Sequence, residues 1–210
     1  EPRTVKADVV LGCDGAFSAV RAKMQYGRFN YSQEYIEHDY KEIAFPAGPD
    51  GTPLMDPQCL HIWPRRYYML MGLANQDGGF TGTLFMPHKA GPDAPDAGFD
   101  KVRTEAEAAR FLKTHFPDAY ALIPDMTQQY MRHPQSNLVI VRCSPWTYGS
   151  TAALFGDAAH AIVPFYGEGM NAGYEDCKVL NDLLDEHGDD NWGAVLHAYR
   201  SAGLVSLPGT

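Results

Sequence analysis

The feature that most constrains this chain is a glycine-rich segment, Leu154–Gly173, which reads LFGDAAHAIVPFYGEGMNAG. The apolar run over residues 152–155 is typical of a buried parallel strand, and it stops at a Gly-Asp pair. A carboxylate, Asp157, is therefore expected at the carboxyl end of a strand, where open α/β sheets bind their ligands. Two glycines then permit a close approach of backbone to a ligand, and a helix is predicted from about Met170.

A related pattern opens the chain. Residues 5–12 are predicted to form a strand, which ends at Cys13-Asp14-Gly15 and is followed by a helix over residues 16–24. Ser18 and Arg21 are three residues apart and share a face of that helix. Because both strands run into an aspartate, we expect them to belong to one parallel sheet.

The residues between these two segments predict an antiparallel sheet with a helix on it. Strand content runs over residues 28–45, and short polar turns separate three further strands, which indicates a meander over residues 59–63, 67–74 and 80–86. Thr104 and Glu107 form a capping box that opens a helix over residues 105–115. Another strand is expected within residues 137–145. The chain is thus divided into one part formed by residues 1–27 and 146–210, and an inserted sheet part over residues 28–145.

Composition narrows the classes of function. The formal charge of −9 and the pI near 5.2 argue against a nucleic-acid surface, which would be basic. Four cysteines lie far apart without a C-x-x-C pair, so reduced thiols are expected, and no ligand cluster predicts a metal site. No apolar run approaches the roughly 18–20 residues of a membrane span. With neither an initiator Met nor a G-x-G-x-x-G turn, the sequence is expected to be a piece of a longer protein with both ends missing.

Both aspartate segments carry a family resemblance. GDAAH followed by P-x-x-G-x-G-M-N resembles the second flavin motif of the single-component aromatic hydroxylases that use FAD and NAD(P)H, and LGCDGAFSAVR resembles their DG motif. The phrases FNYSQEYI, LHIWPR, TLFMP and FPDA extend the likeness to the kynurenine 3-monooxygenases within that class, over residues 7–185. The departures are small: Tyr166 and Glu168 stand where that family often has Phe and Gln.

The resemblance implies a fold and a cofactor site. The fold class is α/β, a partial Rossmann-like FAD-binding domain with an inserted antiparallel-sheet substrate domain. Asp157 would accept hydrogen bonds from a ribose or ribityl diol, and Arg21 would be a candidate contact for the NADPH phosphates; the alternative for Arg21 is a solvated helix residue with a surface ion pair. The amides at the start of the later helix would favour the negative charge of reduced flavin. The expected cofactor-binding residues are Asp14, Gly15, Ser18, Arg21, Gly156, Asp157, Pro164, Gly167, Gly169, Met170 and Asn171.

The implied reaction is hydroxylation of L-kynurenine to 3-hydroxykynurenine, a step of tryptophan catabolism that leads toward NAD. NADPH would reduce FAD, O2 would add to the flavin C4a, and the resulting hydroperoxide would pass oxygen to the ring in a dry pocket. No side chain is needed as acid or base, and His160 is expected to pack and hydrogen bond beside the Asp157 loop. The expected substrate-binding residues are Leu60, Ile62, Met69, Met71, Leu73, Thr83, Phe85, Pro164, Phe165 and Tyr166. For each aliphatic member, plain core is the alternative.

Other functions stay open. The chain could belong to a related FAD-dependent hydroxylase of another aromatic substrate, or be a truncated product without catalysis. Residues 1–210 alone are expected to bind FAD weakly and to be inactive, because the first dinucleotide-binding turn is absent from the sequence. A cytoplasmic protein, or one on the cytosolic face of the mitochondrial outer membrane, fits the resemblance equally.

Overall fold

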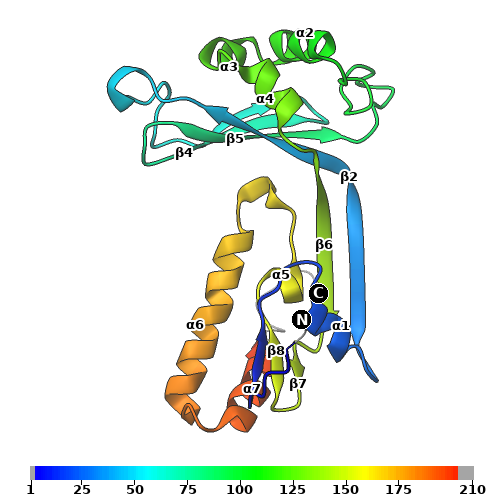
Figure 1. Ribbon diagram of the computed structural model, residues 1–210, viewed down its shortest axis with the longest axis vertical. Coiled ribbons are helices and arrows are strands. Elements are labelled where there is room, and N and C mark those ends of the chain that lie inside the picture. The colour runs from blue at the N-terminus through cyan, green and yellow to red at the C-terminus, as the bar shows by residue number, and fades with distance from the viewer. Residues whose placement is uncertain (1–2, 203–210) are drawn as a thin grey trace. The chain divides into compact units, whose positions relative to one another are not determined.

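A computed structural model describes residues 3–202 (Figure 1). The chain divides into two compact units, which we describe separately: unit 1 is residues 1–35 with residues 139–210, and unit 2 is residues 36–138. The boundaries predicted from the sequence lie between residues 27 and 28 and between residues 145 and 146. The last predicted segment, 146–210, extends beyond the described residues. The assignment of one unit to the cofactor and the other to the substrate stays a prediction.

Unit 1 is built on a small mixed sheet. Its strand order is β1-β8-β7, with β1 and β8 parallel and β7 antiparallel to β8. The three strands are β1 (Val10–Gly12), β7 (Thr147–Tyr148) and β8 (Ala152–Leu154). The strand predicted over residues 5–12 is therefore present, but β1 covers only the last three residues of that range. A Cβ on Gly12 would lie 2.9 Å from the Cβ of Val20, so glycine is required for the close approach of β1 to the next helix.

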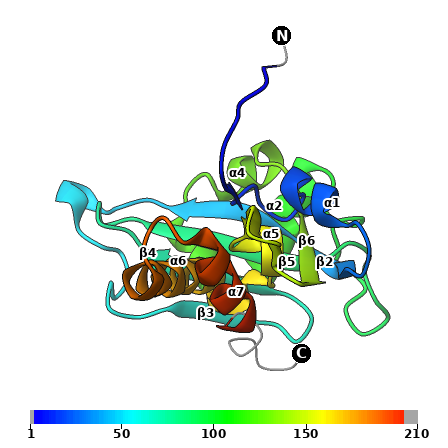
Figure 2. The same ribbon diagram turned by 90° about the horizontal axis from the view of Figure 1, so that it is seen from below.

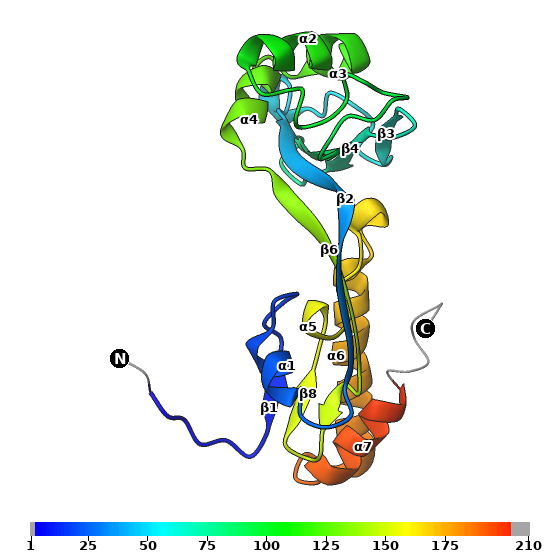
Figure 3. The same ribbon diagram turned by 90° about the vertical axis from the view of Figure 1, so that its right-hand side faces the viewer.

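Helices surround this sheet. The helices of unit 1 are α1 (Ala19–Met24), α5 (Asp157–His160), α6 (Gly169–His187) and α7 (Trp192–Ala202), with a 3-10 turn η2 (Pro164–Tyr166). α1 contacts α5 (Figure 3), and α6 and α7 lie side by side (Figure 2). The core of the unit gathers Leu154 and Phe155 with Leu196 and Tyr199 of α7. No helix among residues 3–202 is long and apolar enough to cross a membrane.

Unit 2 contains most of a five-stranded antiparallel sheet with strand order β3-β4-β5-β2-β6. The strands are β2 (Asn30–Phe45), β3 (His61–Pro64), β4 (Met69–Ala74), β5 (Phe80–Pro87) and β6 (Ser136–Ser144), with a 3-10 turn η1 (Pro49–Gly51). Antiparallel pairing of β3 with β4 and of β4 with β5 confirms the predicted meander. The region expected as strand plus connection over residues 28–45 is one continuous strand, β2, which runs from unit 1 into unit 2.

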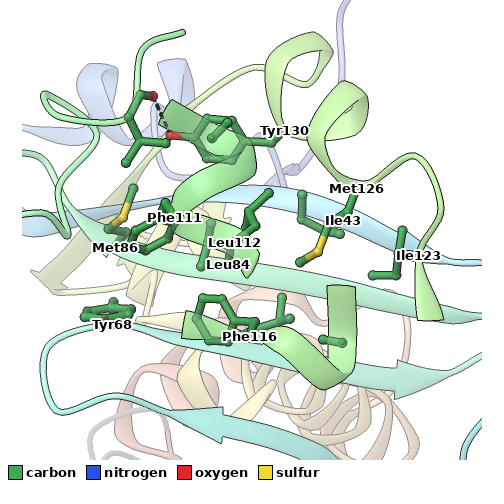
Figure 4. Packing of buried hydrophobic residues seen from close by; sticks show 14 of the residues in the cluster. Ile43, Tyr68, Leu84, Met86, Phe111, Leu112, Phe116, Ile123, Met126 and Tyr130 are labelled. Carbon is green, nitrogen blue, oxygen red and sulfur yellow. Dashed lines mark hydrogen bonds between the residues drawn. The ribbon is translucent and has the colours of Figure 1, made fainter. Parts of the chain in front are cut away.

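Three helices cover one face of the sheet in unit 2 (Figure 4). They are α2 (Glu105–His115), α3 (Pro117–Leu122) and α4 (Met126–Arg132). The capping box of Thr104 and Glu107 is present, and α2 has the predicted bounds. Phe111 and Leu112 of α2 pack with Leu84 of β5 in a continuous apolar core. Unit 2 therefore buries one face of its sheet with its own helices.

Candidate functional site

The two strands that run into aspartates are neighbours. β1 and β8 pair in parallel, with Gly12 opposite Leu154. Just beyond β8, the amide of Phe155 donates a hydrogen bond to the carbonyl of Gly12 at 3.0 Å. The predicted parallel pairing is confirmed. Consequently, the turns that carry Asp14 and Asp157 leave the same edge of the sheet.

The carboxylate of Asp14 is occupied by its own helix. It accepts hydrogen bonds from the Ser18 hydroxyl at 2.5 Å and from the amides of Ala19 and Val20 at 2.7 and 3.1 Å. Burial acts to raise the pKa of Asp14, but these hydrogen bonds outweigh it, and the pKa lies below its ordinary value. Ser18 is the N-cap of α1 and accepts from the amide of Arg21. Contact of Asp14 and Ser18 with FAD stays a prediction.

Arg21 is buried, and its side chain joins α1 to α5. Only 2% of it is exposed, so its interpretation as a solvated surface residue is wrong. Its guanidinium donates to the carbonyls of Ala158 and Ala16 at 2.7 and 2.6 Å, and it lies 4.9 Å from the ring centre of Tyr31. These contacts tie α1 to α5. Contact of Arg21 with an NADPH phosphate stays a prediction.

Asp157 has the opposite surroundings. It is exposed, it is the first residue of α5, and its carboxylate accepts no hydrogen bond from any residue between 3 and 202. The preceding Gly156 has φ 55° and ψ −139°, a conformation that residues other than glycine rarely adopt. The turn therefore leaves a carboxylate open at the carboxyl end of β8, as the sequence predicted.

The segment leading into α6 is open as well. Pro164 begins η2, Gly167 takes the left-handed conformation at φ 71°, and Gly169 begins α6. No side chain caps this helix, because the carboxylate of Glu168 accepts from the Asn171 side chain instead, at 2.9 Å. The first amides of a helix have no acceptor within it. The amino end of α6 thus keeps the free donors that an anion site requires.

Side chains near this helix start are accessible. Met170 is 67% exposed and Tyr166 is 85% exposed, while Phe165 is half-buried. Gly15, in the turn after β1, has φ 78°, and no atom lies within 4 Å of the position that a Cβ would occupy there. The predicted cofactor residues therefore gather around the carboxyl ends of β1 and β8 and the start of α6, all within unit 1.

One residue of this region was missed from the sequence. Asp176, on α6, is 7% exposed, and its Oδ2 accepts from the amide of Gly156 at 2.7 Å. The same oxygen lies 2.8 Å from Nε2 of His160. The expectation that His160 packs and hydrogen bonds beside the Asp157 loop is confirmed, because its ring also lies 4.8 Å from that of Trp146. An acidic residue on a helix in a sequence is usually exposed, so only the fold could show this contact.

Of the seven predicted substrate residues at the sheet, six share one face, and Leu60 immediately precedes β3. In the strand register, Ile62 lies opposite Met71, Met71 opposite Thr83, and Met69 opposite Phe85. Side chains directly opposite one another in antiparallel strands point to the same face. None of the seven sheet residues belongs to the core that α2, α3 and α4 cover. The seven are Leu60, Ile62, Met69, Met71, Leu73, Thr83 and Phe85.

Exposure varies across that face. Leu60, Ile62 and Leu73 are 45%, 46% and 48% exposed, whereas Met71 and Phe85 are buried. Plain core, the alternative for the aliphatic members, therefore still fits the buried Met71, whereas Leu60, Ile62 and Leu73 are largely accessible. Their contact with a substrate stays a prediction. The remaining predicted substrate residues, 164–166, belong to unit 1.

Comparison with protein families identifies the kind of domain. A family model described as an FAD binding domain matches residues 1–203. The chain belongs to this FAD-binding family. Solved structures with the same fold include 2-methyl-3-hydroxypyridine-5-carboxylic acid oxygenase (TM-score 0.70, 17% identity, 94% of this chain and 50% of that one). Another is a variant of Klebsiella pneumoniae HpxO complexed with FAD (TM-score 0.70, 20% identity, 92% and 47%). These structures confirm the predicted mixed α/β class of an FAD-binding domain.

Sequence relatives are more specific. The chain is 45% identical over 199 residues to the kynurenine 3-monooxygenase of Flavobacterium psychrophilum, covering 94% of this chain and 43% of the relative. It is 49% identical over 185 residues to that of Dictyostelium discoideum (88% and 39%) and 42% identical over 192 residues to that of Sus scrofa (90% and 39%). The chain thus spans about two fifths of the length of the curated relatives it matches. The predicted resemblance to the kynurenine 3-monooxygenases is confirmed.

The residues of the site fit the cofactor of this FAD-binding family. A sugar or ribityl hydroxyl needs an acceptor, and Asp157 offers an exposed carboxylate that accepts no hydrogen bond from a described residue. An anionic edge needs donors, and the uncapped start of α6 offers amides. Around Gly15 and Gly167, no atom lies within 4 Å of where a Cβ would stand, so backbone can approach a ligand there. Donors, acceptor and free space are all present in unit 1.

Proposed function

We propose that this chain contributes the FAD site and a substrate-binding sheet of an NADPH-dependent monooxygenase that hydroxylates L-kynurenine to 3-hydroxykynurenine with O2. The identity of 42–49% to kynurenine 3-monooxygenases supports the substrate. The observation that carries the cofactor site is the exposed carboxylate of Asp157, which accepts no hydrogen bond from a described residue, together with the uncapped start of α6. When bound, FAD supplies the redox chemistry and the activation of oxygen.

The residues of this chain would bind and orient. Asp157 would hold a diol of the cofactor through charge-assisted hydrogen bonds, each worth about 1.5–3 kcal/mol. The free amides at the start of α6 would stabilise negative charge on the flavin ring, by about 0.3–1 kcal/mol in an exposed geometry. The apolar face of the sheet that carries Ile62, Met71 and Phe85 would hold the kynurenine ring and exclude water from it.

The complete protein tests this proposal. With FAD bound, kynurenine should stimulate NADPH oxidation, and chromatography should show 3-hydroxykynurenine in matching amount. Simple phenols should give little product. Faster hydroxylation of a phenol than of kynurenine would instead assign the chain to a hydroxylase of another substrate. Absence of bound flavin in the complete protein would favour the non-catalytic alternative.

The two faces of β5 offer a matched pair of variants for the substrate assignment. Phe85→Ala should weaken kynurenine binding while FAD stays bound, because Phe85 lies on the face opposite the helices. Leu84→Ala, on the helix-covered face, is the matched control for lost packing, because both side chains are buried. It should lower the free energy of unfolding by about 2–5 kcal/mol and leave the kynurenine binding constant unchanged. Stopped-flow flavin reduction at varied kynurenine measures the binding constant. An unchanged constant in Phe85→Ala would make Phe85 a packing residue.

A further inference from the structure

Helix α6 buries a charged side chain at one position. Among its described residues only Asp176 is buried, whereas the helix is otherwise exposed or half-buried. Moving a carboxylate out of water is costly unless hydrogen bonds or an opposite charge compensate it. An apolar residue would stabilise the interior at this position without that cost. The contacts of Asp176 therefore need an explanation beyond packing.

Two hydrogen bonds join Asp176 to the turn that carries Asp157. Its Oδ2 accepts from the amide of Gly156 at 2.7 Å and lies 2.8 Å from Nε2 of His160. Gly156 immediately precedes Asp157, and His160 is the last residue of α5. One carboxylate oxygen thus holds both ends of the short segment whose exposed side chain is the candidate cofactor ligand.

The first contact fixes an unusual backbone. Gly156 has φ 55° and ψ −139°, and its amide points to α6. Without this acceptor a part-buried amide would lose its partner, and the glycine could relax to other conformations. Because Asp157 is the next residue, the direction of its side chain depends on the conformation held at Gly156.

The second contact joins two buried side chains, those of Asp176 and His160. His160 is 4% exposed and lies against Trp146. Burial acts to lower the pKa of His160. The hydrogen bond and negative charge of Asp176, with a smaller effect of the Asp157 charge, outweigh burial, so the pKa lies above its ordinary value. This buried hydrogen bond therefore links the last residue of α5 to α6.

We propose that Asp176 is a positioning residue of the FAD site, which holds the Gly156–Asp157 turn so that the Asp157 carboxylate is presented to the cofactor before FAD binds. Asp176 does not itself touch FAD in this proposal. Its effect passes through Asp157, so the inference rests on the proposed role of Asp157 as a cofactor ligand. It adds a residue from α6 that the flavin-motif resemblance did not assign to the site.

A double-mutant cycle tests this in the complete apoprotein, with the FAD dissociation constant read from flavin fluorescence. Asp176→Asn keeps the shape but removes the charge, and it should raise the dissociation constant about tenfold, as expected for losing one hydrogen bond to a charged group. In an Asp157→Ala background, Asp176→Asn should change the FAD dissociation constant by less than about twofold. Asp176 is proposed to act on FAD only through the Asp157 carboxylate, which that background lacks. Asp182→Asn, at an exposed site of α6, is the matched control and should have no effect.

Hydrogen exchange supplies a readout without the cofactor. In apoprotein, Asp176→Asn should speed exchange at the amide of Gly156 and leave that of Leu196, in α7, unchanged. Equal acceleration at both amides would indicate a general loss of stability and overturn the inference. If Asp176→Asn does not fold, Asp176→Glu repeats the cycle with the charge displaced by one methylene group. Failure of both variants to fold would make Asp176 a folding residue, which also overturns it.

The cycle separates two failures. If Asp157→Ala leaves FAD affinity unchanged, the proposed role of Asp157 in the cofactor site is wrong. If Asp157→Ala weakens FAD binding but the effects of the two variants add, the cofactor site stands and only the positioning role of Asp176 is wrong.

Discussion

Asp14 and Asp157 follow neighbouring parallel strands, yet their carboxylates have opposite surroundings. Asp14 accepts three hydrogen bonds from the start of α1, and Asp157 accepts none from a described residue. The difference follows from where the next helix begins. α1 begins at Ala19, so its free amides lie within reach of Asp14, whereas α5 begins at Asp157 itself. An aspartate after a strand is thus available to a ligand only when the following helix does not use it.

The largest effect is expected from replacing Asp157, the aspartate that is open to a ligand. Asp157→Ala should raise the FAD dissociation constant about 10- to 100-fold, because the charge-assisted hydrogen bonds to the cofactor are worth about 1.5–3 kcal/mol each. The melting temperature of the apoprotein should change little, since no described residue loses a hydrogen bond and only the charge at the start of α5 is removed. Flavin content after dialysis and fluorescence titration measure the first effect. Asp189→Ala, in the exposed turn after α6, is the control, and normal flavin retention in Asp157→Ala would contradict the assignment.

Replacing Asp14 tests the aspartate whose carboxylate is used by its own helix. Asp14→Ala should lower the free energy of unfolding of the apoprotein by about 1–2 kcal/mol, as the loss of a helix cap does. FAD affinity should fall less than in Asp157→Ala. Urea unfolding followed by circular dichroism measures the stability, with Asp8→Ala, an exposed residue before β1, as the control. The comparison fails if Asp14→Ala loses flavin more readily than Asp157→Ala while its stability is unchanged.

The smallest expected effect is a pH dependence. The pKa of Asp14 is lower in the folded chain than its ordinary value, so the folded state binds its proton less readily than the unfolded state. The contribution of Asp14 to stability is therefore present above the ordinary carboxyl pKa and is lost as the pH falls through the folded value. Asp14→Asn should reduce the slope of stability against pH in that acidic range, measured by urea unfolding at stepped pH. An identical slope in both proteins would show that Asp14 is not held as a carboxylate.

Local patterns predicted local structure well. The capping box of Thr104 and Glu107 marked the start of α2, and alternation along the strands separated the face carrying Phe85 from the face carrying Leu84. Both signals depend on neighbours a few residues apart, which a single sequence displays. The parallel pairing of β1 with β8 was predictable because each strand runs into a loop with an aspartate.

Long-range polar contacts were not predictable in the same way. In α6, Tyr174 and Cys177 are three residues apart on one face of the helix, yet Tyr174 is 66% exposed and Cys177 is exposed. Among the described residues of α6 only Asp176 is buried, and its partners, Gly156 and His160, lie at the two ends of α5. Arg21 likewise reaches the carbonyl of Ala158, and nothing near Arg21 in the sequence signals that acceptor. Burial of a charge is decided by partners that folding brings together.

Gly12 and Gly156 illustrate two different reasons for having no side chain. At Gly12, a methyl group would collide with Val20, so the limit is size. At Gly156, a Cβ would meet its nearest neighbour, the Cα of Gly173, only at 3.9 Å, so space is available and the limit is handedness. The φ and ψ angles of Gly156 are close to the mirror image of an extended conformation that L residues adopt freely. A D-alanine placed at position 156 by chemical ligation would therefore suit this backbone, whereas its L enantiomer would strain it, and the stereochemistry of a single α-carbon would decide whether the turn before Asp157 keeps its shape.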